Sequence, residues 1–149
     1  MRAVIQRVTK GKVNIKNDCV GSINQGMVVL LAVGREDTPE DLDYMVRKVL
    51  GLRIFDDTDG KMNLSLQDIG GSMLVVSQFT LYGDCRKGKR PSWSEAASPD
   101  FANMMYELFV EEVKKTGVQV ETGVFQAEMS VEIHNDGPVT ILIDSKKQF

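Results

Sequence analysis

The sequence predicts an α+β protein with a mainly antiparallel sheet system and two packed α-helices. Segments typical of β-strands outnumber those typical of helices. The two helical segments, which begin near Thr38 and Ser98, are not regularly interleaved between the strands. With 149 residues, 42% of them hydrophobic, the chain suits one compact domain over residues 1–149, without linker, repeat or low-complexity tract.

The first part of the chain is predicted to form strands. Residues 2–9 and 12–17 alternate between apolar and polar side chains, Asn17-Asp18 is a turn signal, and residues 19–23 form a further short strand. Residues 27–33 are continuously apolar, which is typical of a strand buried on both faces.

The two predicted helices have clear start signals. Thr38 can cap the first helix and Pro39 is tolerated in its first turn. The second helix begins at Ser98, and Gly117 is well placed to cap its end. The apolar positions of each helix share one face. They are Leu42, Met45, Val46, Val49 and Leu50 in the first helix, and Phe101, Met104, Met105, Leu108, Phe109 and Val113 in the second.

The remaining strands are predicted from apolar runs between polar turns. A short strand over 53–55 is followed by the polar turn 56–61, and residues 73–76 form a buried strand. After the second helix, we expect strands over 118–121, 125–134 and 139–144. Between the last two lies a turn rich in residues that direct the backbone.

Two short segments carry the chemistry. The buried strand over 73–76 ends in the polar cluster Ser77-Gln78-Phe79-Thr80, and strands seldom end this way unless something is presented there. In the second segment, Gly137 permits close backbone approach or positive φ, while Pro138 removes a donor and makes a cis peptide possible. Together they indicate a site built from backbone groups and small polar side chains.

Composition excludes several classes of function. The single histidine, His134, is expected on an exposed strand face, so the chain has no Ser-His-Asp or Cys-His device. Cys19 and Cys85 are isolated, which excludes a conventional zinc site and fits a reducing cytoplasm. We expect no metal, no membrane span and no nucleotide fingerprint. A net charge of −3 argues against a general nucleic-acid-coating protein.

A basic cluster follows the first segment. Arg86, Lys87, Lys89 and Arg90 form either a solvated loop or a loop that neutralises phosphates. Trp93 beside it can stack on a base or anchor the core. The residues alone therefore indicate a pocket with an adjoining anion-binding loop, and both alternatives stay open.

The chain resembles the D-aminoacyl-tRNA deacylase family over essentially its whole length. It departs from the family pattern at Gln126, where glycine is expected, and carries Trp93 where phenylalanine is common. The stretches that carry the resemblance are MRAVIQRV, SQFTLYGD, KGKRPSWSEAASP and AEMSVEIHNDGPVTILID.

The resemblance implies a deacylase-type fold with a barrel-like core and a cytoplasmic homodimer that needs no cofactor. It implies that the Gly137-Pro138 peptide is cis and inserts into the partner's active site, and that Arg7 braces this loop. Ala127 and Met129 are implied to lie at the substrate pocket, and the basic loop to bind tRNA. The implied partner is the acceptor end of aminoacyl-tRNA.

The implied activity is proofreading in translation quality control. The enzyme would hydrolyse the ester of D-aminoacyl-tRNA and reject the L form; removal of glycine mischarged on tRNA is a further possibility. Since no general base is evident, backbone N–H groups around Gln78, Phe79 and Thr80 are candidate oxyanion donors, and the substrate's 2′-hydroxyl can position water. Thr80 is either a nucleophile or, as we favour, an orienting residue, and Ser77 completes the predicted catalytic segment.

Two other functions stay open at this point. A non-catalytic tRNA- or RNA-binding protein would bind aminoacylated and deacylated tRNA alike. An esterase or amidase for small molecules would ignore removal of the basic side chains at residues 86–90.

Overall fold

A computed structural model describes all residues, 1–149, and confirms the α+β class. No helix is long and apolar enough to cross a membrane. The elements follow in the order β1 (Arg2–Ile15), β2 (Asp18–Ile23), β3 (Gly26–Ala32), α1 (Pro39–Leu50), β4 (Phe55–Asp56), β5 (Met62–Leu64), β6 (Ser72–Ser77), the short 3₁₀ helix η1 (Phe79–Tyr82), α2 (Pro99–Lys115), β7 (Gln119–Thr122) and β8 (Ser130–Asp144).

The sheet is organised around β1. Its first half pairs antiparallel with β3 and its second half with β2, while β8 pairs antiparallel along its other edge. β6 then pairs parallel with β3, and β7 parallel with β6. The sheet is therefore mixed, and its antiparallel part is the one built on β1.

The sheet curls into a nearly closed barrel. A Cβ atom at Gly21 in β2 would lie 2.6 Å from the carbonyl oxygen of Thr122 in β7, so only glycine permits this approach. No backbone ladder joins β2 to β7. The barrel interior is filled by a small apolar cluster of Val8, Val13, Ile23, Val28, Leu74 and Val76.

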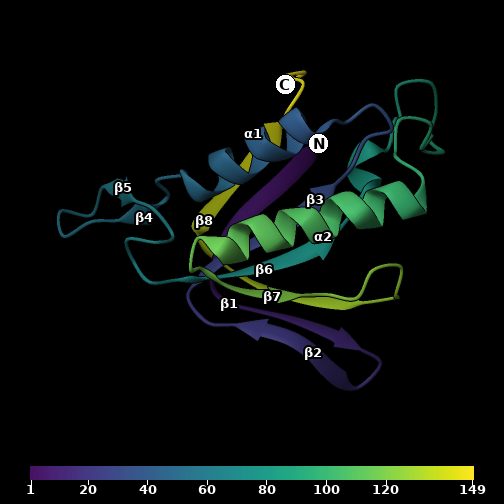
Figure 1. The fold of residues 1–149 in the computed structure, drawn as a ribbon. Helices are drawn as coiled ribbons and strands as arrows, with labels where there is room; N and C mark the ends of the chain where they lie inside the picture. Colours follow the sequence, from purple (N-terminus) through teal and green to yellow (C-terminus); the bar gives the residue numbers. More distant parts are fainter.

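Both helices cover one face of the sheet, and the chain termini lie close together (Figure 1). They bury a larger core of 24 residues against β1, β3 and β6. Thr38 begins α1 in a capping box, in which its backbone N–H donates to Asp41 Oδ2 at 2.9 Å. Gly117, with φ +87°, follows the end of α2.

The buried face of α2 differs from the predicted stripe. Met104 and Leu108 are exposed, whereas Tyr106 and Val110 are buried. The reason is that the Tyr106 hydroxyl donates to the backbone oxygen of Val75 at 2.8 Å, so a polar tip is accommodated inside. The buried face of α2 is therefore shifted around the helix from the predicted stripe, toward Tyr106 and Val110.

Two predicted breaks in strands are wrong. Residues 2–9 and 12–15 lie in the single strand β1, which ends at Ile15, and the predicted turn at 135–138 lies inside the single strand β8. Residues 125–129, also predicted as strand, precede β8 and are not part of it. Gln6 pairs with Thr140 and Val8 with Asn135, so four residues of β8 lie opposite one residue of β1. A bulge of this kind takes up extra residues without ending the strand, which explains the turn-like sequence.

Candidate functional site

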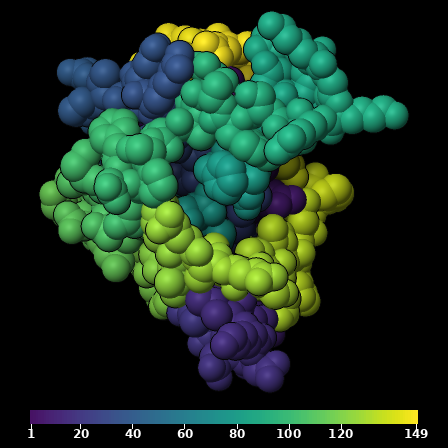
Figure 2. All heavy atoms as spheres, turned by 90° about the vertical axis from the view of Figure 1, so that its right-hand side faces the viewer, coloured from purple at the N-terminus to yellow at the C-terminus, as the bar shows by residue number.

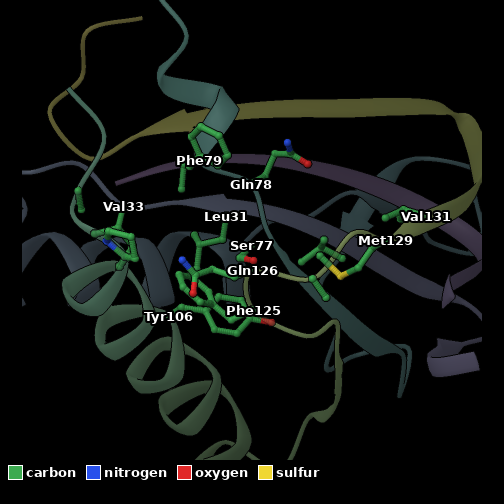
Figure 3. Close-up of a pocket in the computed structure, with 16 residues that line it drawn as sticks. Leu31, Val33, Ser77, Gln78, Phe79, Tyr106, Phe125, Gln126, Met129 and Val131 are labelled. Atoms are coloured by element: carbon green, nitrogen blue, oxygen red, sulfur yellow. The ribbon is translucent and has the colours of Figure 1, made fainter. Parts of the chain in front are cut away.

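A largely apolar pocket of about 550 Å³ opens beside the C-terminal end of β6. Figure 2 shows it as a hollow between the teal segment that follows β6 and the lime segment that follows β7. Most of its 16 lining residues are hydrophobic. The lining residues most visible in Figure 3 are Leu31, Val33, Ser77, Gln78, Phe79, Tyr106, Phe125, Gln126, Met129 and Val131.

The predicted catalytic segment lies at the rim of this pocket. Ser77, Gln78 and Phe79 line it, because β6 ends there and η1 begins. The N–H of Gln78 donates to the backbone oxygen of Leu31 at 2.8 Å, so it is already used by the sheet. The N–H groups of Phe79 and Thr80 have no hydrogen-bond partner in the chain. The candidate oxyanion donors are therefore these two groups and not all three.

Thr80 is exposed and stands just outside the pocket lining. Its hydroxyl oxygen accepts a hydrogen bond from the Gln78 side-chain amide. No histidine, lysine or carboxylate is hydrogen-bonded to it. The hydroxyl is thus held in place by an amide, which cannot accept a proton as a base would.

Aromatic side chains form a wall of the pocket that sequence reasoning missed. Tyr106 comes from α2, and its ring centroid lies 6.2 Å from that of Phe125. Burial raises the pKa of the Tyr106 phenol well above its usual value, so it stays neutral. The only sequence signal for Tyr106 is that it lies between Met105 and Leu108, within the apolar part of α2.

The segment after β7 closes the pocket on another side. Ala127 and Met129 both line it. Gln126 also lines it and adopts φ +60°, a conformation that favours glycine. The departure from the family pattern therefore places an amide side chain at the pocket.

The Gly137-Pro138 peptide is cis, and neither residue lines this pocket. Both residues are exposed on the bulge of β8. They follow Val131, which does line the pocket, by six and seven positions along the strand. The bulge of one chain therefore contributes no residue to the lining of that chain's own pocket.

Arg7 lies opposite the bulge and is buried. Its Nε forms an ion pair with Asp136 at 3.1 Å and donates to the Asp136 backbone oxygen at 3.4 Å. Its Nη1 donates to the backbone oxygen of Ile54 at 2.9 Å and to Asp56 Oδ2 at 3.3 Å. The guanidinium thus joins β1, the start of β4 and the bulge.

Asn135 holds the bulge at its two ends. Its Nδ2 donates to the backbone oxygen of Arg7 at 2.9 Å and to that of Val139 at 3.0 Å. Gly137, with φ +112°, lies between these two anchors. The backbone of the bulge is therefore fixed by side chains on both strands.

The basic loop begins just after η1, and its two ends lie side by side. Asp84 and Ser92 exchange two backbone hydrogen bonds of 2.9 Å at its base. Arg86 is paired with Asp84 at 2.7 Å, and this guanidinium holds the pKa of the Asp84 carboxyl well below its usual range. Lys87, Lys89 and Arg90 are exposed and form no ion pair. These three cations remain available to an anionic partner.

No group of three or more His, Cys, Asp or Glu side chains lies close enough together to hold a metal ion. His134 is exposed on β8. Nothing around the pocket supplies a protein general base. Chemistry at this site would depend on backbone donors, bound water and the substrate's own groups.

Comparisons with known proteins agree on one family. A family model described as D-Tyr-tRNA(Tyr) deacylase matches residues 4–144. D-aminoacyl-tRNA deacylases of Fervidobacterium nodosum and Clostridioides difficile are each 60% identical to this chain over 149 residues, with full coverage of both sequences.

Two solved structures are also similar. One, described as c-Myc DNA Unwinding Element Binding Protein, superposes with a TM-score of 0.92 at 40% identity and covers 97% of this chain and 98% of that chain. Another, described as a probable eukaryotic D-amino acid tRNA deacylase, gives a TM-score of 0.81 at 21% identity, covers 95% and 97% of the two chains, and supports the fold.

Proposed function

The chain belongs to the D-Tyr-tRNA(Tyr) deacylase family and is a hydrolase with D-aminoacyl-tRNA deacylase activity, and we propose that two copies of it complete each other's active sites. In this proposal the Gly137-Pro138 bulge of one subunit enters the pocket beside β6 of the other. The observation that carries it is that the bulge lines no part of the pocket of its own chain. A bulge braced so firmly by Arg7 and Asn135, yet exposed, suits insertion into a partner.

The inserted bulge would act as the chiral filter. Backbone carbonyls held rigidly near the substrate's Cα would accept the amino group of the D form. The side chain of the L form would then clash with the same backbone. Ala127 and Met129 would bound the space on the receiving subunit. Selectivity would thus come from shape and from hydrogen bonds that the L form leaves unmade.

Glycine passes such a filter, because it has no side chain to clash. We therefore infer that glycine mischarged on tRNA is also released. Comparison of glycyl-tRNA with L-alanyl-tRNA tests this, since the two substrates differ by a single methyl group. Hydrolysis of glycyl-tRNA alone agrees with a steric filter, whereas resistance of both contradicts it.

Ester hydrolysis would use the free N–H groups of Phe79 and Thr80 as the oxyanion hole. As the ester carbonyl becomes tetrahedral, its oxygen gains charge that these donors stabilise. Ser77 and Gln78 would shape the same rim. The Thr80 hydroxyl, held by Gln78, would orient the substrate and not attack it. An acyl-Thr80 adduct trapped during turnover would overturn this assignment.

The attacking water would be positioned by the substrate. The absence of a general base among the lining residues motivates this step, because the substrate itself carries a vicinal 2′-hydroxyl on the terminal ribose that is able to take part. A 2′-deoxy substrate should be cleaved very slowly. Unchanged turnover of that substrate would exclude this role.

The basic loop would bind tRNA phosphates through Lys87, Lys89 and Arg90, with Arg86 held by Asp84. A non-catalytic RNA-binding protein would use the same loop without releasing amino acid. The two are separated by the release of labelled tyrosine from D-Tyr-tRNA and L-Tyr-tRNA with EDTA present. Rapid loss of the D form alone supports the deacylase and its filter. Loss of neither supports the RNA-binding protein.

A further inference from the structure

Two aromatic side chains stand exposed between the pocket and the basic loop. Phe79 is 57% exposed and Trp93 is 40% exposed, although both are large and apolar. Their ring centroids lie 5.3 Å apart with an interplanar angle of 68°, an edge-to-face pair. Neither belongs to the buried clusters of the fold, so a role as a core anchor does not explain the pair.

Trp93 is fixed in place by the backbone beneath it. A Cβ atom at Gly83 would lie 2.6 Å from a carbon of the indole ring, so the end of η1 packs directly against that ring. The backbone oxygen of Trp93 accepts the N–H of Ala96 at 3.0 Å. The indole is thus a rigid surface with an exposed part, which lowers the entropy lost when a ligand stacks on it.

The aromatic pair lies between the pocket and the basic loop. Phe79 lines the pocket, and Trp93 directly follows Ser92, which closes the base of the basic loop. Lys87, Lys89 and Arg90 extend from the same base without ion pairs, and Figure 2 shows teal atoms of this region standing out beside the hollow. Pocket, aromatic pair and free cations therefore adjoin one another in that order.

We propose that Phe79 and Trp93 form a stacking shelf for the unpaired nucleotides that precede the terminal adenosine of tRNA. The inference rests on the proposed function, because the pocket receives the end of the same strand. Aromatic faces beside free cations are the arrangement by which proteins hold single-stranded nucleic acid, with bases on the rings and phosphates on the cations. Such stacking tolerates any base, as an enzyme that serves many tRNAs requires.

Trp93 is the only tryptophan in the chain, so its fluorescence reports on the shelf without any label. We expect a cytidine-cytidine-adenosine trinucleotide to quench Trp93 emission in a saturable way. Adenosine alone, which lacks the preceding nucleotides, should leave the emission nearly unchanged. This readout depends on binding and not on hydrolysis, so it tests the shelf even if the proposed function fails. A trinucleotide that competes with substrate without changing the emission would overturn the proposal.

Kinetics with two substrates supply the second test. For Trp93→Ala we expect KM for D-Tyr-tRNA to rise by about tenfold, while kcat/KM for the D-tyrosyl ester of adenosine stays unchanged. Trp93→Phe should keep most of the affinity. Met62→Ala on β5, another exposed apolar residue at 54%, is the matched control and should change neither substrate. Equal losses on both substrates would mean that Trp93 only supports the fold, and would overturn the shelf.

Discussion

The two segments that stand out in the sequence occupy opposite kinds of position. Residues 77–82 follow the end of a buried strand, and the first three of them line the pocket of their own chain. Residues 135–140 form an exposed bulge of β8 that does not line that pocket. One segment is held by the apolar core beneath it, and the other by the polar contacts of Arg7 and Asn135. In the proposed dimer the first segment is the receptor and the second is the insert, and each can be disturbed separately.

The largest effect is expected from the receptor's backbone. Phe79→Pro removes the N–H of Phe79 at the first position of η1, where proline is tolerated. Relative to Phe79→Ala, loss of this one oxyanion donor should lower kcat by about 100- to 1,000-fold with little further change in KM. Phe79→Ala is the control, because it removes the ring and keeps the N–H. Single-turnover deacylation of D-Tyr-tRNA measures both, and equal rates for the two variants would exclude this donor.

The next effect concerns the insert. Arg7→Leu leaves Asp136 and the Ile54 oxygen without their buried partner, so the bulge should loosen. Because the two carboxylates that pair with Arg7 are half-exposed and can be hydrated, we expect the free energy of unfolding to fall by about 2 kcal/mol, mainly from the Ile54 oxygen. Discrimination between D- and L-Tyr-tRNA should fall too, which a stability loss alone would not produce. Urea unfolding and paired deacylation assays measure these, with Arg35→Leu, an exposed ion-pair residue, as control. Unchanged discrimination would separate Arg7 from the filter.

A smaller effect is expected from the basic loop. Replacement of Lys87, Lys89 and Arg90 by glutamine should raise KM for D-Tyr-tRNA by about tenfold and make it less dependent on salt. The rate on the D-tyrosyl ester of adenosine should not change. Equal slopes of log KM against log salt for the variant and the original protein would mean that the loop is merely solvated.

The smallest effect lies away from both segments. Lys146 Nζ donates to Asp41 Oδ2 at 2.6 Å. Burial alone would raise the pKa of Asp41, but this bond and those from Ser145 and Thr38 hold it well below its usual range. Because the pKa is lowered in the folded state, the stabilisation is present above the unfolded pKa of about 4 and is lost as pH falls below it.

Lys146→Met should therefore lower the free energy of unfolding by about 1 kcal/mol at pH 7 and by less as pH falls below about 4. Deacylation at pH 7 should be unaffected, since neither the receptor nor the insert is touched. Urea unfolding at several pH values measures the difference. A pH-independent difference would mean that Asp41 is not the partner that matters.

Sequence patterns predicted most elements because apolar periodicity follows burial directly. They failed at 135–138, where turn-like residues lie in a bulge: local composition does not reveal that β1 continues alongside. They also failed to predict that Tyr106 is buried. A tyrosine hydroxyl can be buried only if it has a hydrogen-bond partner, and the partner here, the backbone oxygen of Val75, lies in another element. The sequence also did not show that the Gln78 N–H donates to the backbone oxygen of Leu31, because that oxygen belongs to the neighbouring strand β3. All three features depend on contacts between segments that are distant in the sequence, which local patterns do not reveal.

The central claim is that each active site combines the receptor of one subunit with the insert of another. Two variants test it directly. Ala127→Trp fills the pocket, and Gly137→Ala places a Cβ at φ +112°, 3.1 Å from the Arg7 guanidinium. We expect each variant alone to lose deacylation of D-Tyr-tRNA. Refolded together in equal amounts, they should regain about a quarter of the original activity, because half of the dimers then carry one intact site. No recovery despite proven mixed dimers would contradict the claim and place the whole site within one chain.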